Sequence, residues 1–192
     1  MSKSNVNNLS RVGIGIDFGT TNSVAALFDG EQLILVTLEG SDAVMPSANY
    51  IERDFSISTG QIAIDKYISD NKGRRVELSA EYLGEVRTTT AGPDHPSDEN
   101  DTTKVFGRPI NDAGLPGRLF RGTKRLLGST PSERTPIFGR KFRLVALITP
   151  ILLAIREELD RIVPDSHKAC LGYPVDFEGI DTNRNQIGLS RL

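Results

Sequence analysis

Alternating apolar and polar positions near the start of the chain predict three short strands, over residues 11–17, 23–28 and 32–38. The dipeptide Asp29-Gly30, between the second and third of them, is a strong turn signal. Short strands joined by tight turns form an antiparallel meander, so we expect the chain to begin with one.

Further along the chain, the apolar positions take the spacing of helices in some segments and of strands in others. The predicted helices cover residues 61–69, 118–127 and 150–163, and residues 183–192 begin like another helix. The predicted extended segments cover 44–52, 56–59 and 168–173, and a hairpin over 136–147 turns near Gly139. Residues 78–86 fit a helix or a strand, and the polar segment 93–103 is typical of a loop or a disordered stretch.

The clearest helix is the one predicted over residues 150–163. Thr149 is a favourable N-cap, and Pro150 suits the first helical position, where the backbone needs no N–H donor. Glu157 and Arg161 lie four residues apart and are predicted to form an ion pair. The short strand that follows this crossover helix is predicted to pair in parallel with an earlier strand.

The composition is typical of a soluble globular protein. With 192 residues, of which 25% are charged and 38% hydrophobic, the chain suits one domain or one lobe of a larger one. No apolar run approaches the roughly 18 residues that cross a bilayer. Residues 1–10 are expected to form a disordered polar tail without the apolar core of a signal peptide. The single cysteine, Cys170, is expected to be a small buried residue, and a lone thiol favours a reducing, cytoplasmic setting.

Charge is distributed unevenly along the chain. Residues 118–143 contain eight basic residues and one acid, Glu133, which gives this stretch a net charge of +7. Because the whole chain carries −2, the remainder carries −9. The basic stretch is either an ordinary solvated face or a surface directed toward phosphate.

The segment Asp17–Ser23 places an acid, a glycine and three hydroxyl groups in one short turn. Gly19 lets another group approach the backbone, and the amides after it, with the hydroxyls of Thr20 and Thr21, can donate hydrogen bonds to an anion. The Asp17 carboxylate would repel phosphate by itself, but it suits a divalent cation bound to that phosphate. The turn joins strand to strand and lacks the spacing of a P-loop. It therefore suggests a site for a metal-bound nucleotide phosphate, and the alternative is a polar hairpin with an Asx-type turn.

The stretch Gly15–Ser23 resembles the first phosphate loop of the actin-like ATPase superfamily. It is more closely similar to that of the seventy-kilodalton heat-shock chaperone family, which reads Gly-Ile-Asp-Leu-Gly-Thr-Thr-Asn-Ser. Three later segments agree with this family in order and spacing: Pro46-Ser47, Gly122–Gly128 and Gly172–Phe177. Sugar kinases share a similar first loop but are not expected to carry the Lys-Arg-Leu segment.

The resemblance implies a role for each matching residue. Asp17 would lie near magnesium, through water, and would act in catalysis with Lys124, which would reach the γ-phosphate and the attacking water. Pro174 would couple the nucleotide domain to a substrate domain. Without the resemblance, Lys124 and Arg125 fit a solvated helix end and Pro174 fits a simple strand terminator. The cofactor contacts that the resemblance implies are Gly19, Thr20, Thr21, Asn22 and Arg125.

The resemblance also implies a fold. It is an α/β fold of the actin-like ATPase or ribonuclease-H-like type, a lobe in which helices flank a mixed sheet. The core subdomain would comprise residues 11–45 and 147–192, with a smaller subdomain inserted over 46–146. The chain departs from the family's pattern after Pro174 and has no counterpart over 78–117, which is expected of a divergent bacterial member.

The function implied is that of the first lobe of a molecular-chaperone ATPase domain, of the kind used in stress responses. The complete protein would bind ATP with Mg between two lobes, hydrolyse it to ADP, and couple this to binding an unfolded client peptide with the help of co-chaperones. The family's second phosphate loop and peptide-binding domain do not occur in these residues. We therefore expect a fragment of a longer cytoplasmic protein, inactive alone, with neither membrane nor nucleic acid as a partner.

Two other functions remain open from the sequence. One is a carbohydrate kinase of the same superfamily, in which a sugar hydroxyl would accept the phosphoryl group. The other is a non-enzymatic module that binds an anionic partner through residues 118–143, with steep salt dependence and no magnesium requirement.

Overall fold

The computed structural model describes residues 13–88, 101–112, 114–128, 134–164, 168–173, 176–178 and 182–192, with the backbone alone over 78–88 and 101–111. Two compact units are present: Met1–Asp70 with Pro116–Leu192, and Asn71–Leu115. The predicted α/β class is confirmed, because helices accompany a mixed sheet and antiparallel sheets. The predicted tail over 1–10 lies outside the described residues, and the subdomain inserted over 46–146 stays a prediction.

The main sheet of the first unit joins the start of the chain to a strand near its end. Its order is β12-β1-β2-β3, and β4 also pairs with β2. The strands are β1 (Gly13–Phe18), β2 (Asn22–Phe28), β3 (Leu33–Leu35), β4 (Val44–Pro46) and β12 (Cys170–Gly172). The predicted meander is confirmed by the antiparallel β1–β2 and β2–β3 pairs. The predicted parallel strand is confirmed as well, because β12 pairs in parallel with β1.

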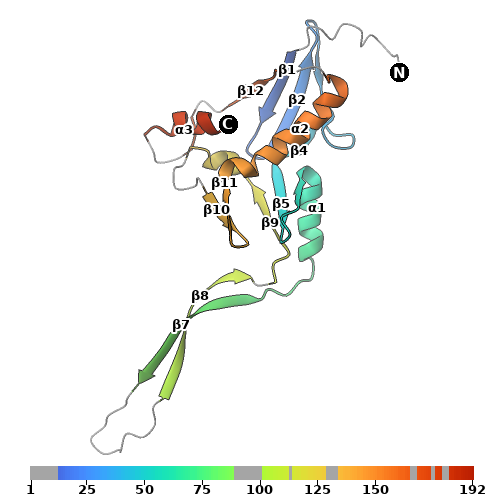
Figure 1. Ribbon diagram of the computed structural model, residues 1–192. Helices are drawn as coiled ribbons and strands as arrows, with labels where there is room; N and C mark the ends of the chain where they lie inside the picture. The colour runs from blue at the N-terminus through green and yellow to red at the C-terminus, as the bar shows by residue number, and fades with distance from the viewer. Residues whose placement is uncertain are drawn as a thin grey trace, which may run out of the picture. The chain divides into compact units, whose positions relative to one another are not determined.

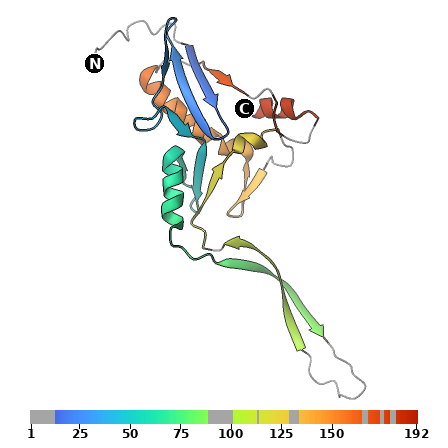
Figure 2. The ribbon, with the colours of Figure 1, turned by 180° about the vertical axis from the view of Figure 1, so that it is seen from behind.

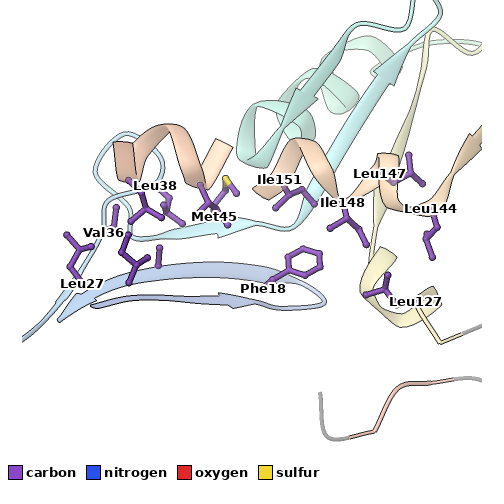
Figure 3. Packing of buried hydrophobic residues seen from close by; sticks show 14 of the residues in the cluster. Phe18, Leu27, Val36, Leu38, Met45, Leu127, Leu144, Leu147, Ile148 and Ile151 are labelled. Carbon is purple, nitrogen blue, oxygen red and sulfur yellow. The ribbon is translucent and has the colours of Figure 1, made fainter. Parts of the chain in front are cut away.

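Helix α2 (Thr149–Ile162) covers one face of this sheet (Figure 1). Between the helix and the sheet lies a continuous apolar core, seen from close by in Figure 3. Phe18 and Ile151 are both fully buried there, and the 3-10 helix η4 (Leu144–Leu147) adds Leu144 and Leu147. The predicted helix over 150–163 is thus confirmed, and its apolar stripe is what attaches it to the sheet.

Two details of α2 differ from the prediction. The N-cap position belongs to Ile148, and the Thr149 hydroxyl instead donates to the Val145 carbonyl, 3.0 Å away. Arg161 pairs with Glu158, three residues earlier, instead of Glu157. The first difference arises because η4 runs into α2, so the turn before the helix already supplies backbone partners at its start. The second arises because residues three and four positions apart are both neighbours on a helix surface, so Glu158 competes with Glu157 for Arg161.

A second sheet has the order β6-β5-β9, with strands β5 (Ala48–Glu52), β6 (Ile57–Thr59) and β9 (Gly117–Arg121). Helix α1 (Gly60–Asn71) packs against it through Ala63, which meets Ala48 and Tyr50 in a small apolar cluster. The predicted extended segments 44–52 and 56–59 and the helix over 61–69 are therefore confirmed.

The helix predicted over residues 118–127 is wrong. The first part of that segment is strand β9, which pairs along its length with β5, and the second part is the 3-10 helix η2 (Thr123–Leu126). Gly122 separates them with a φ of 68°, a left-handed conformation that ends the strand without strain at a glycine. Ladder hydrogen bonds to β5 outweigh a weak local helix propensity.

The rest of the first unit comprises the hairpin of β10 (Arg134–Ile137) and β11 (Arg140–Arg143) and helix α3 (Arg184–Arg191). The predicted hairpin and its turn near Gly139 are confirmed, but its second strand ends at Arg143, and residues 144–147 form η4 instead. Helix α3 confirms the predicted helix start. Cys170 is exposed, which corrects the expectation of a buried residue. The reason is that β12 is the outermost strand of the main sheet in the part of the chain described.

The second unit, Asn71–Leu115, contains a long antiparallel ribbon of β7 (Leu78–Thr88) and β8 (Asp101–Asp112), seen from both sides in Figures 1 and 2. The open choice over residues 78–86 is thus resolved as a strand. Of the loop predicted over 93–103, residues 93–100 lie outside the described residues. Residues 101–103 belong to strand β8 instead. The Arg74 guanidinium pairs with the Asp112 carboxylate at the base of the ribbon.

The core predicts which face of α2 is essential. Replacing the fully buried Ile151 with alanine should lower the free energy of unfolding by about 2–5 kcal/mol, through lost burial and the cavity left behind. The matched control is Leu153→Ala on the opposite side, where the side chain is 54% exposed and the loss should stay below about 0.5 kcal/mol. Urea denaturation followed by circular dichroism measures both, and equal losses would contradict this packing.

Candidate functional site

The loop between β1 and β2 lies where two parallel strands end. Asp17, near the end of β1, is the register partner of Gly172, the last residue of β12. A Cβ atom at Gly172 would lie 3.6 Å from Asp17 Oδ1, so the carboxylate lies close to this strand end. In α/β sheets, ligands bind outside the carboxyl ends of parallel strands, which makes this edge the first place to look for a site.

The loop itself combines a buried anchor with an exposed polar rim. Phe18 is fully buried in the main core and fixes the end of β1. Asp17, Thr21 and Asn22 are exposed, and Thr20 is half-buried. The apolar side chain thus holds the backbone in place while the polar groups stay accessible to a ligand.

Glycine is required inside this loop. A Cβ atom built on Gly19 would lie 2.1 Å from the carbonyl oxygen of Asn22, far closer than any real contact. The backbone therefore closes on itself at this residue, and a side chain would force the turn open. A tight turn of this kind brings successive amide groups near one another, as an anion-binding concavity needs.

The junction between β4 and β5 supports the loop from the other side. The Ser47 amide donates to the Thr21 carbonyl at 2.8 Å, and the buried hydroxyls of Ser23 and Ser47 are 2.8 Å apart. Asn22 pairs with Pro46 in the β2–β4 ladder. The Pro46-Ser47 segment picked out by the sequence thus braces the loop, although sequence reasoning assigned it no contact.

Lys124 reaches the loop from a segment about one hundred residues further along the chain. Its ammonium donates a hydrogen bond to the backbone carbonyl of Phe18, and its Nζ lies 5.6 Å from the centre of the Phe18 ring. At the start of η2, Gly122 lies beside the loop too, because a Cβ atom there would be 3.8 Å from Thr20 Cγ2. The structure therefore brings together Asp17, Lys124 and the predicted phosphate loop.

The electrostatics of Lys124 reflect its half-buried position. Burial lowers the pKa of Lys124 from its ordinary value, and the nearby Asp17 carboxylate acts in the opposite direction. A perturbed cation beside an accessible polar loop is a recognised feature of functional sites. Next to it, the Thr123 hydroxyl is buried and has no hydrogen-bond partner within the described residues, which marks a polar group left for water or a ligand.

Arg125 and Pro174 are not brought to the loop by any contact described. The Arg125 guanidinium pairs with the Glu178 carboxylate, with Nε to oxygen distances of 3.0 and 2.9 Å, and both side chains are largely exposed. Pro174 lies outside the described residues. Their roles in phosphate binding and in coupling stay predictions.

The acidic groups near the loop are few. Among the residues described, no group of three or more His, Cys, Asp or Glu side chains could hold a metal ion. Asp17 therefore belongs to no such group, and one carboxylate by itself makes a poor cation site. Mg²⁺, however, is commonly held by one or two carboxylates together with substrate phosphates, and one exposed carboxylate suits that arrangement.

In the described part of the chain, no helix is long and apolar enough to cross a membrane.

Comparison of the chain with models of known protein families and with the curated proteins gave no match. The interpretation of the site therefore rests on its own chemistry and geometry. Sequence reasoning missed Gly122 and Thr123 as neighbours of the loop, although Gly122 could have been found as a strand-ending glycine two residues before Lys124.

The closed turn at Gly19 predicts that a methyl group added at this position changes the conformation of the loop. Gly19→Ala should move the amide signals of residues 20–22 in ¹H–¹⁵N NMR spectra, because the new Cβ must displace the Asn22 carbonyl. Gly15→Ala is the matched control in β1, where a Cβ atom meets nothing within 4 Å. If both substitutions leave the loop signals unchanged, the closed turn is wrong.

The position of Lys124 predicts the order in which lysines titrate. The ¹³Cε signal of Lys124 should titrate at a lower pH than that of Lys66, whose pKa is raised by its hydrogen bond to Glu52. Since the folded pKa of Lys124 lies below its unfolded value, the folded chain gains stability from this group as the pH rises between the two. Asp17→Asn should lower the midpoint of Lys124 further, and a Lys124 midpoint at or above that of Lys66 would contradict its burial.

Proposed function

We propose that this chain is the first lobe of an actin-like, ribonuclease-H-like ATPase domain, and that the β1–β2 loop holds the phosphates of Mg-bound ATP or ADP. The observation that carries the proposal is the contact of the Lys124 ammonium with the backbone of the loop at Phe18. A half-buried cation beside an exposed acid and a glycine turn has no evident packing purpose, whereas a phosphate would use all three.

The residues present fit a nucleotide phosphate with its metal. The exposed Asp17 carboxylate can accept hydrogen bonds from metal-bound water, and Thr21 and Asn22 of the loop are exposed as well. The unsatisfied hydroxyl of Thr123 provides a further polar group beside Lys124. When bound, magnesium would supply positive charge that neutralises the phosphates.

Each residue then has a separate task. The amides after Gly19, with the hydroxyls of Thr20 and Thr21, would donate hydrogen bonds to phosphate oxygens. Lys124 would supply a fixed positive charge where negative charge develops during phosphoryl transfer, a reaction that depends on positioning and electrostatics. Phe18 and Ser47 hold the loop backbone in place so that these donors need no rearrangement.

For the complete protein, we propose hydrolysis of ATP between this lobe and a second one, coupled to the binding of a client peptide, in the cytoplasm. The support is the resemblance of the loop and of the segment around Lys124 to the heat-shock chaperone family. The actin-like ATPase fold, the client peptide and the co-chaperones are all part of this proposal.

Nucleotide binding can be tested on the 192-residue chain. Titration with Mg·ATP in millimolar excess should shift the amide signals of residues 19–22 in ¹H–¹⁵N NMR spectra, and leaving out magnesium should reduce the effect. Lys124→Ala should weaken binding about ten-fold or more, because a charge-assisted hydrogen bond is lost. Lys141→Ala, an exposed lysine on the β10–β11 hairpin, is the matched control and should bind as the wild type does.

Unchanged loop signals at saturating Mg·ATP would refute the proposed site. Equal binding by the Lys124→Ala variant would remove Lys124 from it.

A further inference from the structure

The β10–β11 hairpin has one face against the core and one face in solvent. On the inner face Ile137 is fully buried, and Phe142 packs against the main core. On the outer face the side chains of Arg134, Lys141 and Arg143 are all exposed. Because successive residues of a strand point to opposite sides, these three cations share that outer face.

The hairpin is held rigidly in this orientation. Its two-residue turn consists of Phe138 and Gly139, with φ values of 46° and 81°, as the tightest hairpin turns require. A left-handed phenylalanine is strained, and the strain is retained because its ring packs edge-on against Phe55, with centroids 6.5 Å apart. Phe55 also stacks on Phe142 at 5.7 Å. The outer cations are therefore presented by a fixed ribbon.

Neighbouring arginines interact with other groups of the protein, whereas the three outer cations have no such partner among the described residues. The Arg140 guanidinium lies over the Phe55 ring at 4.1 Å, and Arg118 donates to the Pro136 carbonyl at 2.7 Å. In contrast, no hydrogen bond or ion pair joins Arg134, Lys141 or Arg143 to another described side chain.

Two of these cations face each other at close range. Arg134 and Arg143 are direct cross-strand partners in the β10–β11 ladder. Like charges in directly opposite positions destabilise a hairpin, and a pair of opposite charges there would stabilise it. The sequence thus keeps an arrangement that weakens the free protein, which an anionic ligand lying across the two strands would explain.

We propose that the outer face of the β10–β11 hairpin binds an extended acidic segment of a partner protein. Lys141 and Arg143 are two residues apart on one strand, a separation of about 6.6–6.8 Å, which equals the spacing of alternate side chains in an extended peptide. Strand β11 has no paired strand on its other side in the part of the chain described, and it contains no proline. Its edge can therefore pair with an added strand, whereas Pro136 lacks the N–H that β10 would need.

The number of cations favours an acidic peptide over nucleic acid. Three phosphate contacts would give a weak, steeply salt-dependent interaction with a nucleic acid backbone. The phenylalanine rings that could stack on bases are half-buried and packed against one another and beneath Arg140. A short acidic segment needs only as many carboxylates as the hairpin has cations, and its backbone can add ladder hydrogen bonds.

Charged residues on an edge strand also discourage edge-to-edge aggregation, which is the structural alternative. Reversing the charges separates the two explanations, because glutamates protect an edge as well as lysine and arginine do. Binding of an acidic peptide, in contrast, requires positive charge.

The probe is a fluorescein-labelled peptide of alternating threonine and glutamate, and fluorescence anisotropy at physiological salt measures its binding to the 192-residue chain. The wild type should bind it, and the double variant Lys141→Glu, Arg143→Glu should bind at least about ten-fold more weakly. Lys72→Glu, an exposed lysine of the other unit, is the single-reversal control and should bind as the wild type does.

A second variant guards against misfolding. Arg134→Glu places opposite charges across the strands, so it should raise Tm by about 1–3 °C while it weakens peptide binding. The proposal is overturned if the wild type does not bind the peptide, if the double variant binds it equally well, or if oligothymidylate binds more tightly than the peptide. None of these outcomes bears on the β1–β2 loop, so nucleotide binding is tested separately.

Discussion

The half-buried ammonium of Lys124 rests against the backbone carbonyl of Phe18, and the arrangement of the candidate site follows from that contact. Removing a cation from water is unfavourable unless polar partners compensate. Here the partner is a carbonyl whose position is fixed, because the Phe18 side chain is fully buried between the sheet and α2. The core thereby sets the position of a charge at the edge of the sheet.

The same constraint links the main sheet to the second one. Strand β9 pairs with β5 and ends at Gly122, and the chain then turns into η2 with Lys124 in its first turn. Strand β5 in turn follows Ser47, whose amide holds the loop at Thr21. The loop is thus supported by two segments that are far apart in the sequence, Ser47 before β5 and η2 after β9. Such a site stays preorganised without a ligand, as electrostatic stabilisation of a reaction requires.

Local sequence signals predicted the elements whose burial pattern is regular. The β1–β2–β3 meander, the helix α2 and the β10–β11 hairpin follow from alternation, helical spacing and a glycine turn. The helix prediction over residues 118–121 failed because their fit to a helix is weak. Their partner strand β5 is about seventy positions away in the sequence, and a local pattern contains no information about it. The prediction that Cys170 is buried failed because an apolar run does not reveal whether its strand lies at the edge of a sheet. In the candidate site, the polar character of Asp17–Asn22 is visible from residue types, whereas the contact of Ser47 with the loop and the burial of the Thr123 hydroxyl depend on the tertiary structure.

The claim that the β1–β2 loop holds a metal-bound phosphate is tested most directly by locating the metal. Mn²⁺ can replace magnesium in its complex with ADP, and it broadens the NMR signals of nearby nuclei. In the 192-residue chain, Mn·ADP should broaden the amide signals of residues 17–22 and of Lys124 before any others, and excess Mg·ADP should restore them. Broadening that spares this loop, or that Mn²⁺ produces equally well without nucleotide, would contradict the account.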